Sequence, residues 1–469
     1  MHLGIDFSTT GLVVYADKNG TPEVQLNSQT HRLFIQWLTF DESGRQFGDA
    51  AKVLCFRNLD RSFWNITFLL SDLNAPFPFV SQSQPNDGFP INLREQRFQI
   101  SLPHLLAMLF SHLFRELCDL VQCQQLSVTC SLPLCLNKSQ RRLLQEILQY
   151  AGFHDVTIVD PIYCLSWSYL YKMNSRLTNQ LEVILFLDIG YMCTDIGVVQ
   201  MNNESANILL SKSSTSFRGQ LLDQELLQLC VDKANQLFNQ DVTQNKKSMF
   251  RLYQEIKKTR VNLSSCPEVE LDIDSFIDGE DFEIDVNRRD FEASLEHHLL
   301  QLGNLLTKVD QFFVKNSLKL SKVVLLGGFS YVPVIETTIK SHFGYLQSRL
   351  FERTLNAFES VSEGALLSEL IQNEDTFTVI NHSLQSAHNQ ISDERLFDSS
   401  LFRELEDRFK QIDDEEQYKS TMTTELLKKV KKTKRNASKR YRNSLLNFVL
   451  TNIWGSFEQK VSKSKGPFL

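Results

Sequence analysis

The sequence predicts an α/β fold in which two similarly built lobes enclose a central cleft. The first observation is a strand, an aspartate-containing turn and a second strand within residues 3–15. The second is a repeat of this unit within residues 183–200. The third is a later strand, residues 323–326, that ends in two glycines. Because each unit opens one α/β half, we expect the two aspartate turns to face each other across the cleft.

The first lobe is expected to cover residues 1–173. Its opening strands form an antiparallel meander with a turn at Asn19-Gly20. A helix that begins after Ser101 is apolar almost all round and is therefore buried on several sides. In the next helix, Asn137 and Gln140 have the spacing of a capping box. The expected strands cover residues 3–7, 12–15, 24–26, 34–40, 126–130 and 156–159, and the expected helices residues 101–121 and 137–151.

The second lobe is expected to cover residues 174–372 and is followed by a charged tail, residues 373–469. Helices are expected at residues 249–264 and 290–313, with an acidic alternating β segment, residues 269–285, between them. After Asn373 no further strand is expected. Residues 393–416 hold ten acidic against four basic side chains, and residues 428–442 hold nine basic ones. We therefore expect the tail to be helical or partly disordered.

The composition is that of a globular protein. The chain has 469 residues, 42% hydrophobic and 22% charged, with a net charge of −7, which excludes a disordered tract and a dedicated polybasic nucleic-acid binder. The start MHLGIDFSTTG lacks the features of a signal peptide, and no apolar run reaches the ~18 residues of a membrane span. Nine cysteines without a C-x-x-C pair indicate buried, reduced thiols in a cytoplasmic or nuclear protein.

Three segments have the chemistry of a phosphate and metal site. In LGIDFSTTG a buried strand delivers Asp6 to a turn that is rich in hydroxyl groups. A carboxylate there can hold Mg²⁺ through its water shell, while hydroxyls and turn N–H groups bind phosphate oxygens. Taken singly, each segment also fits an ordinary turn of a large sheet; their order and spacing favour a site. The residues concerned are Asp6, Ser8, Thr9 and Thr10 in the first segment, Asp188, Gly190 and Asp195 in the second, and Gly327 and Gly328 in the third.

Over residues 1–370 these segments resemble the superfamily of actin, sugar kinases and 70-kDa heat-shock proteins, and within it the heat-shock chaperone family. Further matches to that family are FGDAAK at 47–52, Pro133, Asn137, Ser139, Gln140, Arg141, Gly219, Asp223, Asn356, Glu359, Gly364 and Ala365. The resemblance implies a two-lobed actin-like fold, ATP or ADP as ligand, and Mg²⁺ held through water by Asp6 and Asp188. It also implies that Pro133 and Arg141 relay the nucleotide state between the lobes and a partner domain.

The departures from the family pattern fall on its catalytic positions. Thr67 stands where the family has its catalytic lysine, and a neutral hydroxyl cannot stabilise a transferring phosphoryl group. Asp160 replaces the catalytic glutamate and is one methylene shorter. The second phosphate loop keeps Gly190 but continues with Tyr191 and Met192, which crowd the γ-phosphate. Cys193 stands there where threonine is usual, and Ser8 replaces a glycine of the first loop.

The nucleoside end of the expected site is also changed. Tyr331 replaces an arginine that stacks on the base, and an aromatic ring can take over that stacking. For the family's Glu-x-x-Lys contact to the ribose, Glu255 and Lys258 have the spacing. A gapless register from Ser275 backwards instead places Lys257 and Arg260 there. The remaining residues expected to contact the nucleotide are Ser8, Thr9, Thr10, Gly190, Cys193, Asp195, Gly219, Gly327 and Gly328.

Three functions fit this pattern. The leading one is an ATP-binding relative of the heat-shock chaperones with weak or absent hydrolysis, acting as a chaperone or as a co-chaperone that regulates nucleotide exchange of a true family member. Its partners would be other chaperones or co-chaperones. The alternatives are a nucleotide-free pseudo-ATPase scaffold whose basic residues 428–442 bind RNA or ribosomes, and a sugar kinase of the same superfamily. For the tail, a solvated charge run before a helix docked on the parent domain is equally compatible.

Overall fold

The computed structural model describes residues 1–9, 11–71, 88–93, 96–346, 350–371, 378–381 and 396–413. The chain divides into two compact units. The first comprises Met1–Glu42 and Gln46–Ser399, and the second Ser43–Arg45 and Ser400–Leu469. The first unit contains both predicted lobes and is described first.

The first lobe is built on a mixed sheet. β1 pairs in parallel with β10 and antiparallel with β2, and β2 pairs antiparallel with β3, so the expected meander is confirmed. Asn19 and Gly20 both have positive φ in the turn between β2 and β3, as a two-residue hairpin requires. The sheet order is β11 (Val156–Val159), β10 (Ser127–Ser131), β1 (His2–Phe7), β2 (Gly11–Lys18), β3 (Thr21–Val24), with β4 (Phe34–Ile35) on β2.

The rest of this lobe surrounds that sheet. The expected strand at 34–40 is divided at Gln36, whose buried side chain has a separate role described below. The capping box is confirmed, because Asn137 Oδ1 accepts from the Gln140 N–H and Gln140 Oε1 from the Asn137 N–H. The elements are β5 (Trp37–Asp41), β6 (Gly44–Phe47), α1 (Gly48–Cys55), β7 (Ser62–Trp64), α2 (Ile66–Leu69), β8 (Phe89–Leu93), β9 (Gln96–Ile100), α3 (Leu102–Val121) and α4 (Lys138–Ala151).

The second lobe has its own mixed sheet, in which β12 pairs antiparallel with β13 and in parallel with β17. The expectation of no strand after Asn373 is wrong, because Thr378–Asn381 pairs in parallel with Ser205–Ile208 of β14. The sheet order is β18 (Phe351–Glu352), β17 (Lys322–Leu326), β12 (Glu182–Ile189), β13 (Thr194–Met201), β14 (Ser205–Ser214), β19 (Thr378–Asn381).

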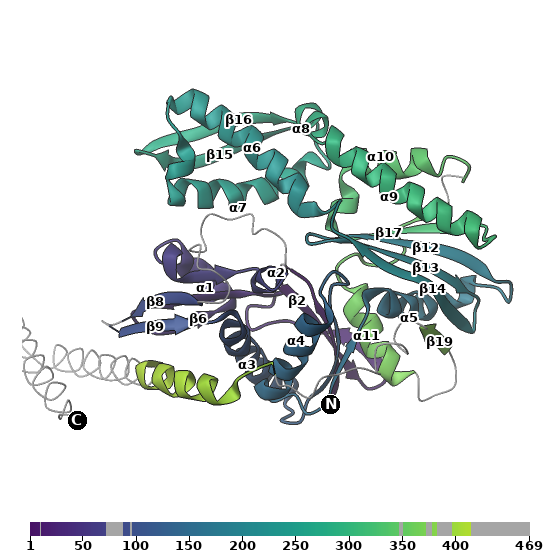
Figure 1. The fold of residues 1–469 in the computed structure, drawn as a ribbon, viewed down its shortest axis with the longest axis horizontal. Coiled ribbons are helices and arrows are strands. Elements are labelled where there is room, and N and C mark those ends of the chain that lie inside the picture. Colours follow the sequence, from purple (N-terminus) through teal and green to yellow (C-terminus); the bar gives the residue numbers. More distant parts are fainter. Residues whose placement is uncertain are drawn as a thin grey trace, which may run out of the picture. The chain divides into compact units, whose positions relative to one another are not determined.

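A group of helices and one hairpin completes the second lobe (Figure 1). The acidic alternating segment forms the expected hairpin, β15 with β16. The helix expected at 290–313 is two helices that meet at the buried Leu295. Among the described residues, every helix is too short or too polar to cross a bilayer. The elements are α6 (Gly219–Phe238), α7 (Lys246–Leu263), β15 (Glu268–Ile277), β16 (Glu280–Asn287), α8 (Arg288–Ser294), α9 (Glu296–Lys315), η4 (Gly328–Tyr331) and α10 (Pro333–His342).

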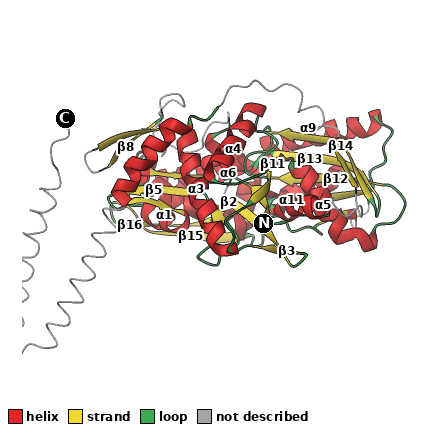
Figure 2. Ribbon diagram, turned by 90° about the horizontal axis from the view of Figure 1, so that it is seen from below, coloured by secondary structure: helices red, strands yellow, loops and turns green. Residues whose placement is uncertain are grey.

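Two helices pack between the sheets of the lobes. α5 (Pro161–Met173) lies against β13 and β14, and α11 (Ser360–Leu370) lies against β1 and β10, with α5 and α11 in contact (Figures 1 and 2). Both contacts of α11 need glycine. A Cβ on Gly364 of α11 would lie 1.8 Å from the Cys164 carbonyl oxygen of α5, and a Cβ on Gly4 of β1 would lie 2.3 Å from the Ser362 carbonyl oxygen of α11. α11 therefore joins the first lobe's sheet although the sequence assigns it to the second lobe.

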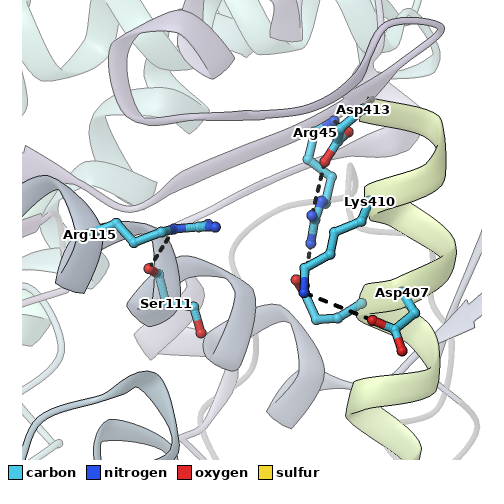
Figure 3. Close-up of polar contacts among 7 residues, drawn as sticks. Arg45, Ser111, Arg115, Asp407, Lys410 and Asp413 are labelled. Atoms are coloured by element: carbon cyan, nitrogen blue, oxygen red, sulfur yellow. Dashed lines mark hydrogen bonds and ion pairs between the residues drawn. The ribbon is translucent and has the colours of Figure 1, made fainter. Parts of the chain in front are cut away.

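The second unit is held by Arg45. The described residues 399–413 are helical, and the Arg45 side chain forms ion pairs with Glu406 and, at 3.0 Å, with Asp413 (Figure 3). The guanidinium also lies over the Phe409 ring, 5.0 Å from its centroid. Acidic side chains of residues 393–416 thus pair with Arg45; the basic residues 428–442 lie outside the described part of the chain.

Candidate nucleotide-binding cleft

Three aspartates from facing strand ends form the centre of the candidate site. Asp188 and Asp195 are directly opposite each other in the β12–β13 pair, where side chains on one face lie about 5 Å apart. Asp6 comes from β1 of the first lobe and acts electrostatically on Asp188, and Asp195 acts on Asp6. The structure therefore brings together the three carboxylates that were predicted from the sequence as site residues.

Burial perturbs all three carboxyl groups. It is the largest cause that raises the pKa of Asp6 to about 7 and that of Asp195 to about 6, and it raises the pKa of Asp188 well above its usual value. Repulsion among the carboxylates adds to the rise for Asp6 and Asp188. The hydrogen bond from the Cys193 thiol and, to a smaller extent, the charge of Arg141 partly offset the rise for Asp195. The cluster thus concentrates carboxyl groups that a cation would stabilise in their charged form.

Gly327 holds the third segment against this cluster. Its φ is 76°, and a Cβ there would lie 2.3 Å from the Ile189 carbonyl oxygen and 2.5 Å from Asp188 Oδ1. Only glycine fits this position. At Gly328 an added Cβ would meet nothing closer than the Phe358 ring at 3.5 Å. The backbone after β17 is therefore in close contact with Asp188 at Gly327 and has free space beside it at Gly328.

The first loop is tied down by neutral hydrogen bonds. Ser8 Oγ donates to the Gly11 carbonyl (2.9 Å), and Gln36 Nε2 donates to the Ser8 carbonyl (2.7 Å). Thr67 donates to Gln36 Oε1 from its N–H (3.0 Å) and its hydroxyl (2.5 Å), and both side chains are fully buried. Thr9 is buried, and Thr10 lies outside the described residues. Thr67 thus supplies an uncharged internal link at the predicted lysine position.

The second loop is closed on itself and on α6. The N–H groups of Gly219 and Gln220, at the N-terminus of α6, donate to the carbonyls of Gly190 (2.9 Å) and Tyr191 (3.0 Å). The side chains of Tyr191, Met192 and Cys193 are buried. The Tyr191 hydroxyl lies 3.0 Å from that of Tyr253, and the Cys193 thiol donates to Asp195 (3.3 Å). The first amides of α6 are therefore already occupied by protein carbonyls.

The nucleoside end contains a buried ion pair. Arg260 Nε lies 2.7 Å from Asp223 Oδ1, and its guanidinium stacks on the Phe329 ring at 3.9 Å. Lys257 lies over the Tyr253 ring at 4.6 Å, and burial lowers its pKa to about 8. Lys257 and Arg260, the two residues that the gapless register placed at the ribose contact, thus point inward in the structure.

The other residues that were predicted to contact the nucleoside have different partners. Glu255 and Lys258 bind each other on the surface of α7 at 2.7 Å, so the structure does not bring this pair to the Arg260 cluster. Tyr331 is 44% exposed and carries Arg353 over its ring at 4.3 Å. A ring that is exposed in this way can still stack on a flat ligand.

The predicted relay residues contact each other. Arg141 donates to the carbonyl of Pro133 at 2.9 Å and forms an ion pair with Asp160 at 3.3 Å. Burial raises the pKa of Asp160, and Arg141 opposes that rise. Asp160, the predicted catalytic carboxylate just before α5, is therefore paired with a cation of its own lobe.

Comparison with known proteins places this geometry in a family. The family model of the Hsp70 protein matches residues 2–386, which is most of the chain. The chain belongs to the Hsp70 family. Among curated proteins, heat shock protein 88 of Dictyostelium discoideum is 24% identical over 379 residues, which cover 78% of this chain and 48% of that protein. The chain thus spans about half the length of this relative.

Hsp70 proteins generally bind ATP or ADP with Mg²⁺, and the residues of this chain fit that ligand in part. Oxygen donors at Asp6, Asp188 and Asp195 suit Mg²⁺, which would neutralise the developing charge of the phosphates. The described residues contain no group of three side chains that could bind a metal directly, so the ion would be held through water. The second phosphate loop does not fit a nucleotide phosphate, because the first N–H groups of α6 already donate to carbonyls of the loop itself.

Three residues of this Hsp70 site were not selected from the sequence as site residues. Gln36 links the first loop to Thr67, Tyr253 holds Tyr191, and Phe329 lies under Arg260. Arg260 was given only as an alternative. Each makes its contact through the fold, and only Arg260 had a signal in the sequence: it lies four residues after the buried Ile256, on the inward face of α7.

Proposed function

We propose that this chain is a chaperone-like ATP-binding protein. Binding of Mg-nucleotide changes the conformation of the protein, and the nucleotide is hydrolysed weakly or not at all. The observation that carries the proposal is the cluster of Asp6, Asp188 and Asp195 at facing strand ends of two lobes. Three buried carboxylates with raised pKa values are costly to keep without a cation. A bound Mg²⁺ with its nucleotide would offset that cost.

Weak hydrolysis follows from the two altered catalytic positions. Thr67 is uncharged, fully buried and bonded to Gln36, so it cannot reach a phosphate. Asp160 is paired with Arg141. Neither residue can supply the charge stabilisation or water activation that phosphoryl transfer needs. The retained contact of Arg141 with Pro133 supports a conformational role, as a chaperone or as a co-chaperone that promotes nucleotide exchange in another family member.

The second loop favours a second candidate, a nucleotide-free scaffold of the same fold. The carbonyl groups of this loop accept the hydrogen bonds of the first α6 N–H groups, and the buried side chain of Tyr191 takes up space that a glycine would leave open. RNA or ribosome binding through residues 428–442 stays a prediction, because that segment lies outside the described residues. The same holds for a cytoplasmic or nuclear location.

Calorimetric titration of the full chain with Mg-ATP and then Mg-ADP separates the two candidates. Micromolar binding that is lost in Asp188→Asn, together with turnover at the background rate, supports the first. Asp119→Asn, on the exposed face of α3, is the matched control and keeps wild-type binding. Absence of binding at millimolar nucleotide contradicts the first candidate and leaves the scaffold. Release of labelled ADP from a hydrolytically active Hsp70, measured with and without this chain, tests the exchange role.

A further inference from the structure

A cation of α7 lacks a counter-ion at the nucleoside end of the site. Lys257 lies deep in the second lobe, yet its side chain keeps partial exposure. In the described part of the chain no carboxylate lies within ion-pair distance of Lys257 Nζ, which is placed over the Tyr253 ring at 4.6 Å. Burial is the largest cause that lowers the pKa of Lys257 to about 8. Its charge is therefore poorly compensated, and a ligand can reach it.

Asp223 does not supply the missing counter-ion. It attracts Lys257, but its Oδ1 is already paired with Arg260 Nε at 2.7 Å. Its Oδ2 is buried and, among the described residues, accepts no hydrogen bond, so it takes none from Lys257. Arg260 and Lys52 of the first lobe both repel Lys257. The group around Lys257 thus holds three cations and one carboxylate and keeps an excess of positive charge.

The position of Lys257 indicates which part of a nucleotide it would meet. Arg260, three residues further along α7, stacks on the Phe329 ring at 3.9 Å. Phe329 belongs to η4, which begins at the open Gly328 and ends at the exposed ring of Tyr331. A flat base that stacks on Tyr331 would therefore have its sugar toward Phe329 and α7.

The metal-bound phosphates of a nucleotide would not neutralise Lys257. Its charge is not among those that shift the pKa of Asp6 or of Asp188, and neither carboxylate is among the groups that shift the pKa of Lys257. The cation and the metal-binding carboxylates thus face different parts of a ligand. A ligand that satisfies both needs a second anionic group near its sugar.

We propose that Lys257 binds a phosphate group on the ribose of the nucleotide, so that this cleft selects nucleotides phosphorylated at the 2′ or 3′ position. The proposal rests on the nucleotide function proposed above and specifies its ligand. A ribose phosphate brings the negative charge that Lys257 lacks and accepts hydrogen bonds from its ammonium group. Such a charged hydrogen bond makes binding about 10- to 100-fold tighter.

Displacement of labelled ADP from the full chain tests the proposal, after direct titration has shown that ADP binds. The competitors are AMP, adenosine 2′,5′-bisphosphate, adenosine 3′,5′-bisphosphate and inorganic phosphate, each with Mg²⁺. One of the two bisphosphates should bind about 10- to 100-fold more tightly than AMP, and that isomer gives the position of the phosphate. Inorganic phosphate should compete far less well than this bisphosphate, because it has no base to stack on Tyr331.

Three variants test whether the preference depends on Lys257. Lys257→Gln removes a desolvated charge and its repulsion from Arg260, so it should fold and should lose the preference. Lys257→Glu should reverse the preference, because a carboxylate repels a phosphate. Lys258→Gln is the matched control, since Lys258 is the exposed neighbour that pairs with Glu255, and it should keep the preference. If Lys257→Glu does not fold, the wild type and Lys257→Gln decide.

Three results would overturn the ribose-phosphate site. In the first, ADP binds but neither bisphosphate binds more tightly than AMP; the nucleotide function then stands without this site. In the second, the preference persists in folded Lys257→Gln, or inorganic phosphate competes as well as the bisphosphate. In the third, no nucleotide binds, ADP included; the nucleotide function then fails, and the ribose-phosphate site fails with it.

Discussion

Replacement of Asp6 by asparagine tests the electrostatics of the cleft most directly. The change preserves the shape of the side chain and removes one of three mutually repelling charges. The unfolded state has an ordinary pKa near 3.8 at this group, whereas the folded state has about 7. Between pH 4 and 7 the folded chain therefore binds a proton that the unfolded chain does not. Stability should fall as pH rises through this window and the cost should be complete above about pH 7.

The size of the effect follows from the pKa difference. A rise from 3.8 to about 7 corresponds to on the order of 4 kcal/mol at pH 7.5, at 1.36 kcal/mol for each pH unit. Asp6 is partly exposed, so solvent screens its charge. We therefore expect Asp6→Asn to raise the free energy of unfolding by about 2 kcal/mol at pH 7.5 and to change it little at pH 4.5.

Urea unfolding in EDTA between pH 4.5 and 7.5 measures this profile. Asp195, with a pKa of about 6, titrates in the same window and adds to the wild-type slope, so the difference between wild type and Asp6→Asn gives the contribution of Asp6. Lys257, with a pKa of about 8, titrates mainly above the window. Mg²⁺ added in place of EDTA should stabilise the wild type more than Asp6→Asn. Asp119→Asn should stay within about 0.5 kcal/mol of the wild type at every pH. A wild-type profile without a fall toward pH 7.5, or a destabilised Asp6→Asn at pH 7.5, would refute the reasoning.

Three further changes test the loops and the buried ion pair. Tyr191→Gly should strengthen Mg-ATP binding about tenfold in calorimetry, because loss of the ring gives a phosphate room to accept one hydrogen bond from the loop, which contributes about 1.5 kcal/mol when the acceptor is charged; unchanged affinity would show that the ring does not crowd the site. Arg260→Met leaves a buried carboxylate unpaired and should cost about 3–5 kcal/mol in urea unfolding, against less than about 0.5 kcal/mol for the exposed Lys258→Ala. Gly327→Ala should cost about 3 kcal/mol through strain and overlap. Gly303→Ala, in open space on α9, should gain about 0.5–1 kcal/mol; equal effects at the two glycines would contradict the close approach.

Local patterns were sufficient for most elements of the fold. Short hydrophobic runs located β1, β2, β12 and β13, and the aspartates at their ends followed from that assignment. The capping box at Asn137 was recognised because both of its bonds connect residues three apart. Such features depend only on neighbours in sequence, so the sequence alone defines them.

Features that depend on distant partners were missed or misplaced. β19 has four residues, too few for a periodic signal, and it becomes a strand by pairing with β14 about 170 residues earlier. The break at Leu295 has no glycine or proline to mark it. Glu255 and Lys258 have the same spacing as Lys257 and Arg260, and only the position of α7 on the fold decides which pair turns inward.

The altered residues of the cleft change its chemistry in one direction. Thr67 and Tyr191 are uncharged and buried, and the cation of the nucleoside end, Arg260, is neutralised by Asp223. The carboxylates remain, and Asp195, whose pKa is raised only to about 6, carries negative charge at neutral pH. A recess of this kind attracts a metal ion more strongly than it attracts free phosphate. Nucleotide binding in this Hsp70 chain should therefore depend on Mg²⁺ to a degree that intact phosphate loops would not require.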